Sequence, residues 1–239
     1  MPYERTDDAS ISIWRCAAAA GAALVWASSA LAADDPAMAP LDRYLMDRAA
    51  EIALAKSAAP PSIADRATVL VLTRHGYVTA VTGGNGFVCA VERAWMSPYD
   101  FPGFWNPRMR GPLCFNPPAA RSVLPYTIRR TDLALAGRSR RQMVATIRKD
   151  VERHALPRLE AGALTYMMSK QGYLNDDAGH WIPHLMFYFP RAVGATWGSD
   201  LPGAPPMLNP QFQESPEALS VLMVPVTHWS DGTPAPAMH

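Results

Sequence analysis

The densest group of side chains that could carry out chemistry lies in a short segment that ends at His184. Two carboxylates, Asp176 and Asp177, precede two imidazoles, His180 and His184. Imidazole and carboxylate groups are common zinc ligands, and imidazole also titrates close to neutral pH. The four-residue spacing of the histidines would place both on one face of a helix. Pro183 disfavours a helix here, so the spacing alone does not define a metal site.

His228 follows the last predicted strand and extends the same candidate site. If the last two predicted strands pair antiparallel, His184 and His228 reach the same edge of the sheet, near His180. One interpretation is then a site for zinc or a similar divalent metal, with Asp177 completing the ligand set. The other interpretation is a polar hairpin turn with the histidines at its mouth and no metal.

A second candidate site is the triplet Arg74-His75-Gly76, which follows the apolar, β-branched run 68–73. The run and the triplet look like the opening motif of the histidine phosphatase superfamily, in which histidine accepts the phosphate and arginine binds its oxygens. This local likeness implies a phosphatase-like role for Arg74 and His75. The competing interpretation is a polar turn between two strands, in which the two side chains diverge.

Residues 95–118 interleave aromatic rings with prolines, so neither a helix nor a central strand is expected to persist there. A loop of this length in a compact domain is usually functional or held down by other contacts. Its rings are expected either to bind a sugar, a peptide or an apolar partner, or to fill a gap beneath the loop. The candidate binding residues are Trp95, Tyr99, Phe104 and Trp105.

The N-terminal segment has the features of a cleavable export signal. An apolar, alanine-rich run follows Arg15 and closes on Ala30-Leu31-Ala32, the small-x-small pattern that a signal peptidase accepts. We therefore expect residues 1–32 to be a signal peptide. The mature protein is expected to be periplasmic or secreted, with no stable membrane span after cleavage.

The cysteines support the same expectation. Cleavage after residue 32 removes Cys16 and leaves Cys89 and Cys114. Two cysteines in an oxidising compartment predict one disulfide, here a bond that straps the loop 95–118 to the strand before it.

Charge and length restrict the function classes. The chain has 22 basic and 21 acidic residues, and the predicted leader carries two and three of them, which leaves 20 and 18. Because basic and acidic residues nearly balance, the chain creates no strong electrostatic field that would attract nucleic acid. The partner is therefore expected to be an unidentified ligand or protein. A mature chain of 207 residues can form one domain with a substantial core.

The order of helical and extended segments predicts one α+β domain over 33–229, in which helices pack a mostly antiparallel sheet. The glycine-rich stretch 83–86 predicts a tight hairpin, so the first three strands are expected to form an antiparallel meander. The Gly/Pro-rich residues 230–239 are expected to form a flexible tail. Strands are predicted at 68–73, 77–82, 87–91, 164–168, 184–189 and 219–226.

Helical periodicity covers 41–55 and 119–154. Pro125 and Gly137 interrupt the second block, and Ser139 with Gln142 forms a candidate capping box after the second break.

The segments 85–89, 104–126, 166–174 and 224–232 resemble a group of uncharacterised exported bacterial proteins with no assigned activity. The resemblance covers most of the mature chain. It implies export and a shared fold, and it transfers no functional residue.

Two classes of function follow from the residues, which leave open whether the protein is an enzyme. The first, which we favour, is a non-catalytic binding or structural protein that uses the loop 95–118. The alternative is a hydrolase. It would be metal-dependent through His180, His184 and His228, or phosphatase-like through Arg74 and His75.

Overall fold

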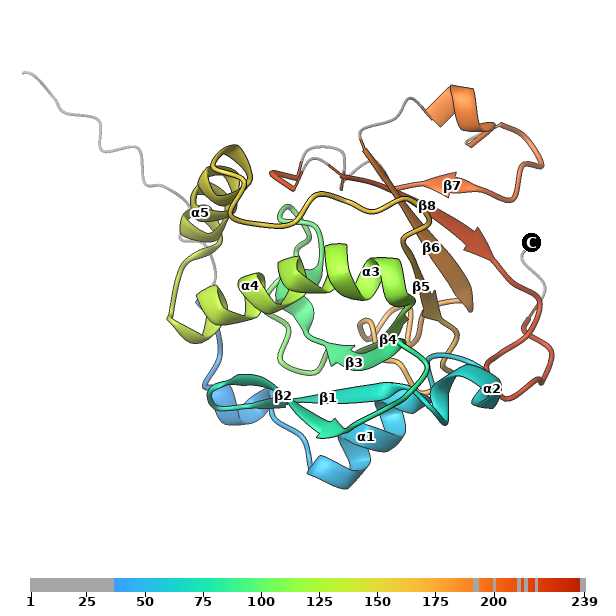
Figure 1. Ribbon diagram of the computed structural model, residues 1–239, viewed down its shortest axis with the longest axis horizontal. Coiled ribbons are helices and arrows are strands. Elements are labelled where there is room, and N and C mark those ends of the chain that lie inside the picture. The colour runs from blue at the N-terminus through green and yellow to red at the C-terminus, as the bar shows by residue number, and fades with distance from the viewer. Residues whose placement is uncertain are drawn as a thin grey trace, which may run out of the picture. The chain divides into compact units, whose positions relative to one another are not determined.

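The structure, a computed structural model, describes residues 37–190, 194–199, 201–209, 212, 215–217 and 219–236. Within these residues eight strands form one mixed sheet, in the order β2-β1-β3-β4-β5-β6-β8-β7 (Figure 1). The strands are β1 (Thr68–Thr73), β2 (Gly76–Val81), β3 (Val88–Glu92), β4 (Gly111–Phe115), β5 (Leu164–Met167), β6 (His184–Pro190), β7 (Met207–Leu208) and β8 (Leu219–Pro225). The helices are α1 (Arg48–Lys56), α2 (Pro61–Ala64), α3 (Pro117–Ser122), α4 (Leu124–Leu135) and α5 (Arg140–Glu152), with short 3-10 helices η1 (Leu41–Arg43), η2 (Ala94–Met96) and η3 (Gly194–Trp197). The predicted α+β class and single domain are confirmed, and β1 with β3 is the parallel pair in the described sheet.

The two faces of the sheet are covered by different helices (Figure 1). Strand side chains alternate between faces, so Val69 and Cys89 pack with α1 on one face. The next residues along, Leu70 and Ala90, pack with α3 and the start of α4 on the other. Glu92 shares the face of Ala90, two residues before it, and therefore points to the side of α4.

The predicted meander is wrong at β3, which pairs parallel with β1 instead of antiparallel with β2. After β2 the chain crosses the start of β1, where the Gly83 amide donates to Thr68 Oγ1 at 3.0 Å. A Cβ on Gly83 would lie 2.2 Å from the carbonyl carbon of Ala67. The glycines therefore permit a close crossing to the far side of β1 rather than a hairpin.

A central strand lies inside the proline-rich segment, so the prediction of an unstructured loop over 95–118 is wrong for β4, which pairs with β3 and β5. The backbone N–H and C=O of Arg110 form hydrogen bonds with Tyr173 on one side of the strand. Backbone groups two residues apart point to the same side, so the nitrogen of Pro112 faces that side as well. On that side β5 pairs with Cys114 and Phe115, beyond the proline. Pro112 therefore lies where no ladder hydrogen bond is required of it.

The second helical block follows its sequence signals. Pro125 lies in the first turn of α4, and Gly137 adopts φ +69° between α4 and α5. The Ser139 side chain accepts from the Gln142 amide and the Gln142 side chain accepts from the Ser139 amide, which confirms the predicted capping box.

The predicted disulfide is confirmed between Cys89 and Cys114, which are fully buried. The two residues face each other in the β3–β4 ladder, so the bond joins neighbouring strands. Its predicted role as a strap across an open loop is therefore wrong. A buried disulfide indicates an oxidising, extracytoplasmic environment.

Most of the predicted flexible tail, 230–239, is tied to the body. The Ser230 amide donates to Met168 O at 2.9 Å, and the Ser230 hydroxyl donates to Ser57 O at 2.6 Å. Lys170 and Asp231 form an ion pair at 2.8 Å. The Gly/Pro-rich residues form turns here, because the Ala235 amide donates a hydrogen bond back to Thr227 O.

The predicted signal peptide, residues 1–32, lies outside the described residues. In the part of the chain that the structure describes, no helix combines the length and apolar character needed to cross a bilayer.

Candidate functional site

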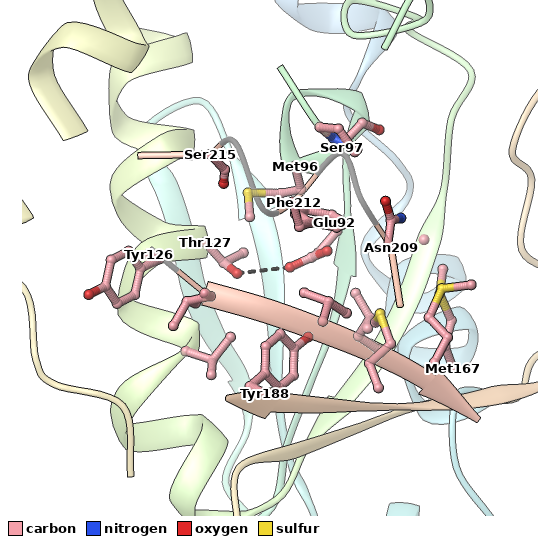
Figure 2. Close-up of a pocket in the computed structure, with 18 of the residues that line it drawn as sticks. Glu92, Met96, Ser97, Tyr126, Thr127, Met167, Tyr188, Asn209, Phe212 and Ser215 are labelled. Atoms are coloured by element: carbon pink, nitrogen blue, oxygen red, sulfur yellow. Dashed lines mark hydrogen bonds between the residues drawn. The ribbon is translucent and has the colours of Figure 1, made fainter. Parts of the chain in front are cut away.

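A cavity of about 260 Å³ lies against the face of the sheet that α4 covers (Figure 2). Every second side chain of two neighbouring strands points to this face, and these side chains form the cavity floor. They are His184, Met186 and Tyr188 from β6, and Leu219, Val221 and Met223 from β8. Helix α4 adds Tyr126, Thr127 and Arg130. The site therefore combines strands and a helix that are far apart in the sequence.

The cavity lining is mostly apolar and rich in methionine. Met96, Met109, Met167, Met186 and Met223 all contribute to it. Methionine is flexible and polarisable, so such a surface adapts to ligands of differing shape.

Gly111 leaves room at the cavity wall where β4 pairs with Glu92 of β3. A Cβ at this position would lie 3.3 Å from the terminal methyl of Met167 and 3.6 Å from the Trp181 ring. The absent side chain thus keeps space open between two of the apolar lining groups.

Glu92 faces this apolar space with no cation in contact among the residues that the structure describes. Thr127 Oγ1 donates to Glu92 Oε1 at 2.8 Å, the contact marked in Figure 2. Burial raises the pKa of Glu92 to about 7, while the Thr127 hydrogen bond and the charge of Arg130 act in the opposite direction. Near neutral pH this side chain exchanges between a hydrogen-bond donor and an anion, which is the property of a general acid or of a ligand-binding carboxyl.

The other carboxylate of the cavity, Glu217, is paired. Arg130 Nε donates to Glu217 Oε1 at 2.7 Å, and both side chains are buried. Burial opposes ionisation of Glu217, but the Arg130 charge and the hydrogen bonds hold its pKa below the usual value. The guanidinium also donates to Ser97 O and lies 4.0 Å from the centre of the Tyr99 ring. The Arg130–Glu217 pair is therefore neutral overall, and its contacts hold one wall of the cavity in place.

His184 and Tyr188 line the cavity as neutral groups. Burial lowers the pKa of His184, although a hydrogen bond between Nδ1 and Ile182 O at 2.6 Å acts against the shift. Burial raises the pKa of Tyr188, whose hydroxyl lies 3.1 Å from Thr165 Oγ1. Neither supplies a positive charge to Glu92.

The four predicted metal ligands do not gather at one point. The last strands pair antiparallel, and His184 faces Pro225, so the histidines do share one end of the sheet. The His180 ring, however, packs edge-on against Trp229, with 5.0 Å between ring centres, and His228 Nδ1 lies 2.9 Å from Thr227 Oγ1. Among the described residues no group of three or more His, Cys, Asp or Glu side chains has an arrangement that could hold a metal ion.

The region around Asp177 is a turn closed by the Asn175–Gly179 bridge. Asp177 is exposed in this turn, and the neighbouring Asp176 pairs with Arg108 at 2.9 Å.

Arg74 and His75 form the two-residue turn between β1 and β2 and are both exposed. Arg74 pairs with Asp42, and the His75 amide donates to Thr73 Oγ1 at 3.1 Å. Neither lines the cavity.

The aromatic candidates mostly fill the interior beside the cavity. Trp95, Phe104 and Trp105 belong to a buried cluster that Tyr99 packs against. Trp95 Nε1 donates to Thr131 Oγ1 of α4 at 3.0 Å, which docks the segment on the helix. The rings therefore position the segment, whose other residues, Met96 and Phe101 among them, reach the cavity.

Sequence reasoning missed Glu92, although one signal was available. The residue ends an otherwise apolar strand and has the same parity as Ala90, which a buried strand would turn inward. Of the site residues predicted from sequence, His184 lines the cavity.

The chain was compared with protein-family models, curated proteins and solved structures, and none of the three comparisons gave a match.

Proposed function

We propose that this is an exported binding protein that holds a small, mainly apolar molecule in the cavity beside α4. The observation that carries the proposal is the cavity of about 260 Å³, with a methionine-rich lining and one carboxyl group that has no cation in contact among the described residues. An apolar cavity of about 150 Å³ accommodates benzene, so this one has room for a ring with a short chain.

The mature protein, released by cleavage after Ala32, would work in the periplasm or outside the cell. The buried Cys89–Cys114 bond supports this location. N-terminal sequencing of protein recovered from the periplasm should begin at Ala33. A chain that retains residues 1–32 would contradict the export proposal.

Filling the cavity tests the binding proposal. Met223 lines it from β8, whereas the next residue, Val224, lies on the opposite face of the same strand. We expect toluene and indole to bind the mature protein in saturation-transfer NMR. The same probes should fail to bind Met223→Trp and should still bind Val224→Trp.

Retention of both probes by Met223→Trp would place their binding elsewhere and contradict the proposal. Loss of binding in Val224→Trp as well, with circular dichroism unchanged, would also contradict it. The hydrolase alternative lacks comparable support, because Arg74 and His75 lie on an exposed turn.

A further inference from the structure

Charge is unbalanced in the cavity once Glu92 ionises. The described charged groups that line it are Glu92, Arg130 and Glu217. Arg130 and Glu217 neutralise each other at 2.7 Å, so the ionised cavity carries one net negative charge.

The surroundings of Glu92 supply no counter-ion at contact distance. Among the described residues Glu92 forms no ion pair, and its hydrogen bond comes from the uncharged Thr127 hydroxyl. Arg130 of α4 acts on Glu92 through its charge but is paired with Glu217. The other titratable groups near Glu92 or lining the cavity are uncharged phenols and an uncharged imidazole: Tyr77, Tyr188, Tyr126 and His184.

A partly buried carboxylate with no cation in contact is costly to ionise, and a cation from the ligand lowers that cost. The rest of the ligand meets Met167, Trp181 and Met186, which favour an apolar body. The Trp181 ring also provides an aromatic surface that suits an ammonium group.

Building on the proposed binding function, we infer that the ligand is a primary or secondary amine with an apolar body of about one ring, and that its ammonium group pairs with Glu92. This arrangement places the positive charge against the carboxyl oxygens and the ring among the methionines. The pair neutralises the cavity.

Three probes of the same shape test the inference: 2-phenylethylamine, 2-phenylethanol and phenylacetate. Titration calorimetry at pH 8.5 should show the amine binding the mature protein at least tenfold more tightly than the alcohol, and the carboxylate not at all. In Glu92→Gln the amine should lose at least tenfold in affinity, while the alcohol should be unchanged. Glu152→Gln removes an exposed carboxylate from the end of α5 and should leave all three affinities unchanged.

Proton linkage gives a second readout. The pKa of Glu92 in the ligand-free protein is about 7, so at pH 6 the carboxyl group is mostly protonated. Pairing with the ammonium group should then release about one proton from Glu92 per amine bound at pH 6, and almost none at pH 8.5. Titrations in two buffers of different ionisation enthalpy measure this release. Glu92→Gln should release none at either pH.

The outcomes separate the two proposals. If the alcohol binds as tightly as the amine, the ligand-class inference is overturned and the binding function stands. If the amine is preferred equally in Glu92→Gln, the charge lies elsewhere and the inference is overturned. If no probe binds the mature protein, the binding function itself fails.

Discussion

A carboxyl group among methionine and aromatic side chains ionises less readily than one in water, because burial removes the solvation of its charge. Glu92 is in this position, with a hydrogen bond from Thr127 and no counter-ion in contact among the described residues. The cavity therefore contains a group whose charge changes near neutral pH. At the scale of the single residue, this property links protein stability to ligand binding.

We predict that Glu92 makes the ligand-free protein less stable as pH rises. The pKa is raised from 4.5 to about 7 on folding, so the stabilising contribution is full below pH 4.5 and is lost as pH rises through 7. Glu92→Gln retains an acceptor for Thr127 but cannot ionise. The free energy of unfolding of the variant should match the wild type near pH 4.5 and exceed it by up to about 3 kcal/mol at pH 8.

Urea unfolding of both proteins at several values between pH 4.5 and 8 measures this difference. Glu152→Gln serves as the control for removing a carboxylate at the surface. A constant difference between wild type and Glu92→Gln across this range would contradict the prediction.

At the scale of elements, the cavity depends on how β3 is placed. Because β3 lies between β1 and β4, its last residue, Glu92, reaches the side of α4. Two features maintain this placement: the crossing at Gly83, and the ion pair between Glu51 of α1 and Arg93, the residue after β3. Two substitutions examine them separately.

Gly83→Ala should destabilise the fold. Its Cβ would lie 2.2 Å from the backbone of Ala67, so the segment that crosses β1 must shift, with an expected loss of about 1–3 kcal/mol. Gly84→Ala is the matched control, since the nearest heavy atom to its Cβ is the Arg66 side chain at 3.9 Å. Chemical denaturation of both variants checks the prediction, and equal losses would refute the close crossing.

Arg93→Met should lower the free energy of unfolding by about 3–5 kcal/mol, because it leaves Glu51 buried without a cation. Arg93 Nη2 donates to Glu51 Oε1 at 2.9 Å, and Nε donates to Tyr44 O. The same oxygen of Glu51 accepts from the Leu72 amide. Arg93 Nη1 also donates to Val91 O, so the network joins α1 to β1 and β3.

Arg121→Met is the control for the network, because the Arg121–Glu160 pair is exposed and solvent screens such pairs, so its loss should change the free energy of unfolding little. Equal unfolding midpoints in urea for the two variants would contradict a structural role for the buried pair.

At the scale of the whole molecule, the C-terminal segment, residues 226–236, links parts of the fold that are distant in the sequence. Ser230 bonds to Met168 after β5 and to Ser57 after α1, so it joins elements from both halves of the chain. Trp229 is buried beside His180. The segment also follows β8 directly, and β8 forms part of the cavity floor.

A chain that ends at Trp229 should be less stable than one that ends at Pro236. The shorter chain loses the two Ser230 hydrogen bonds and the contact between Trp229 N and Thr233 O. At about 1 kcal/mol for each bond, the expected loss is about 2–4 kcal/mol. Thermal unfolding of the two truncated proteins measures it, and coincident curves would show that the segment is dispensable.

Local signals in the sequence determined much of the secondary structure. The β-branched run of β1, the capping box at Ser139 and the break at Gly137 were all predicted from the residues themselves. The disulfide also followed, because the predicted cleavage after residue 32 would leave Cys89 and Cys114 as the two remaining cysteines. These features depend on neighbours in the chain or on residue counts, which a sequence displays directly.

Tertiary structure alone decided the sheet order and the site. Pro112 looked incompatible with a central strand until β5 was seen to pair beyond it. Glu92 looked like an ordinary strand end, since the α4, β6 and β8 residues that line the cavity with it lie far along the chain. Which side chains share a face across distant strands depends on their pairing, and the energy of burying one carboxyl among them exists only once the chain has folded.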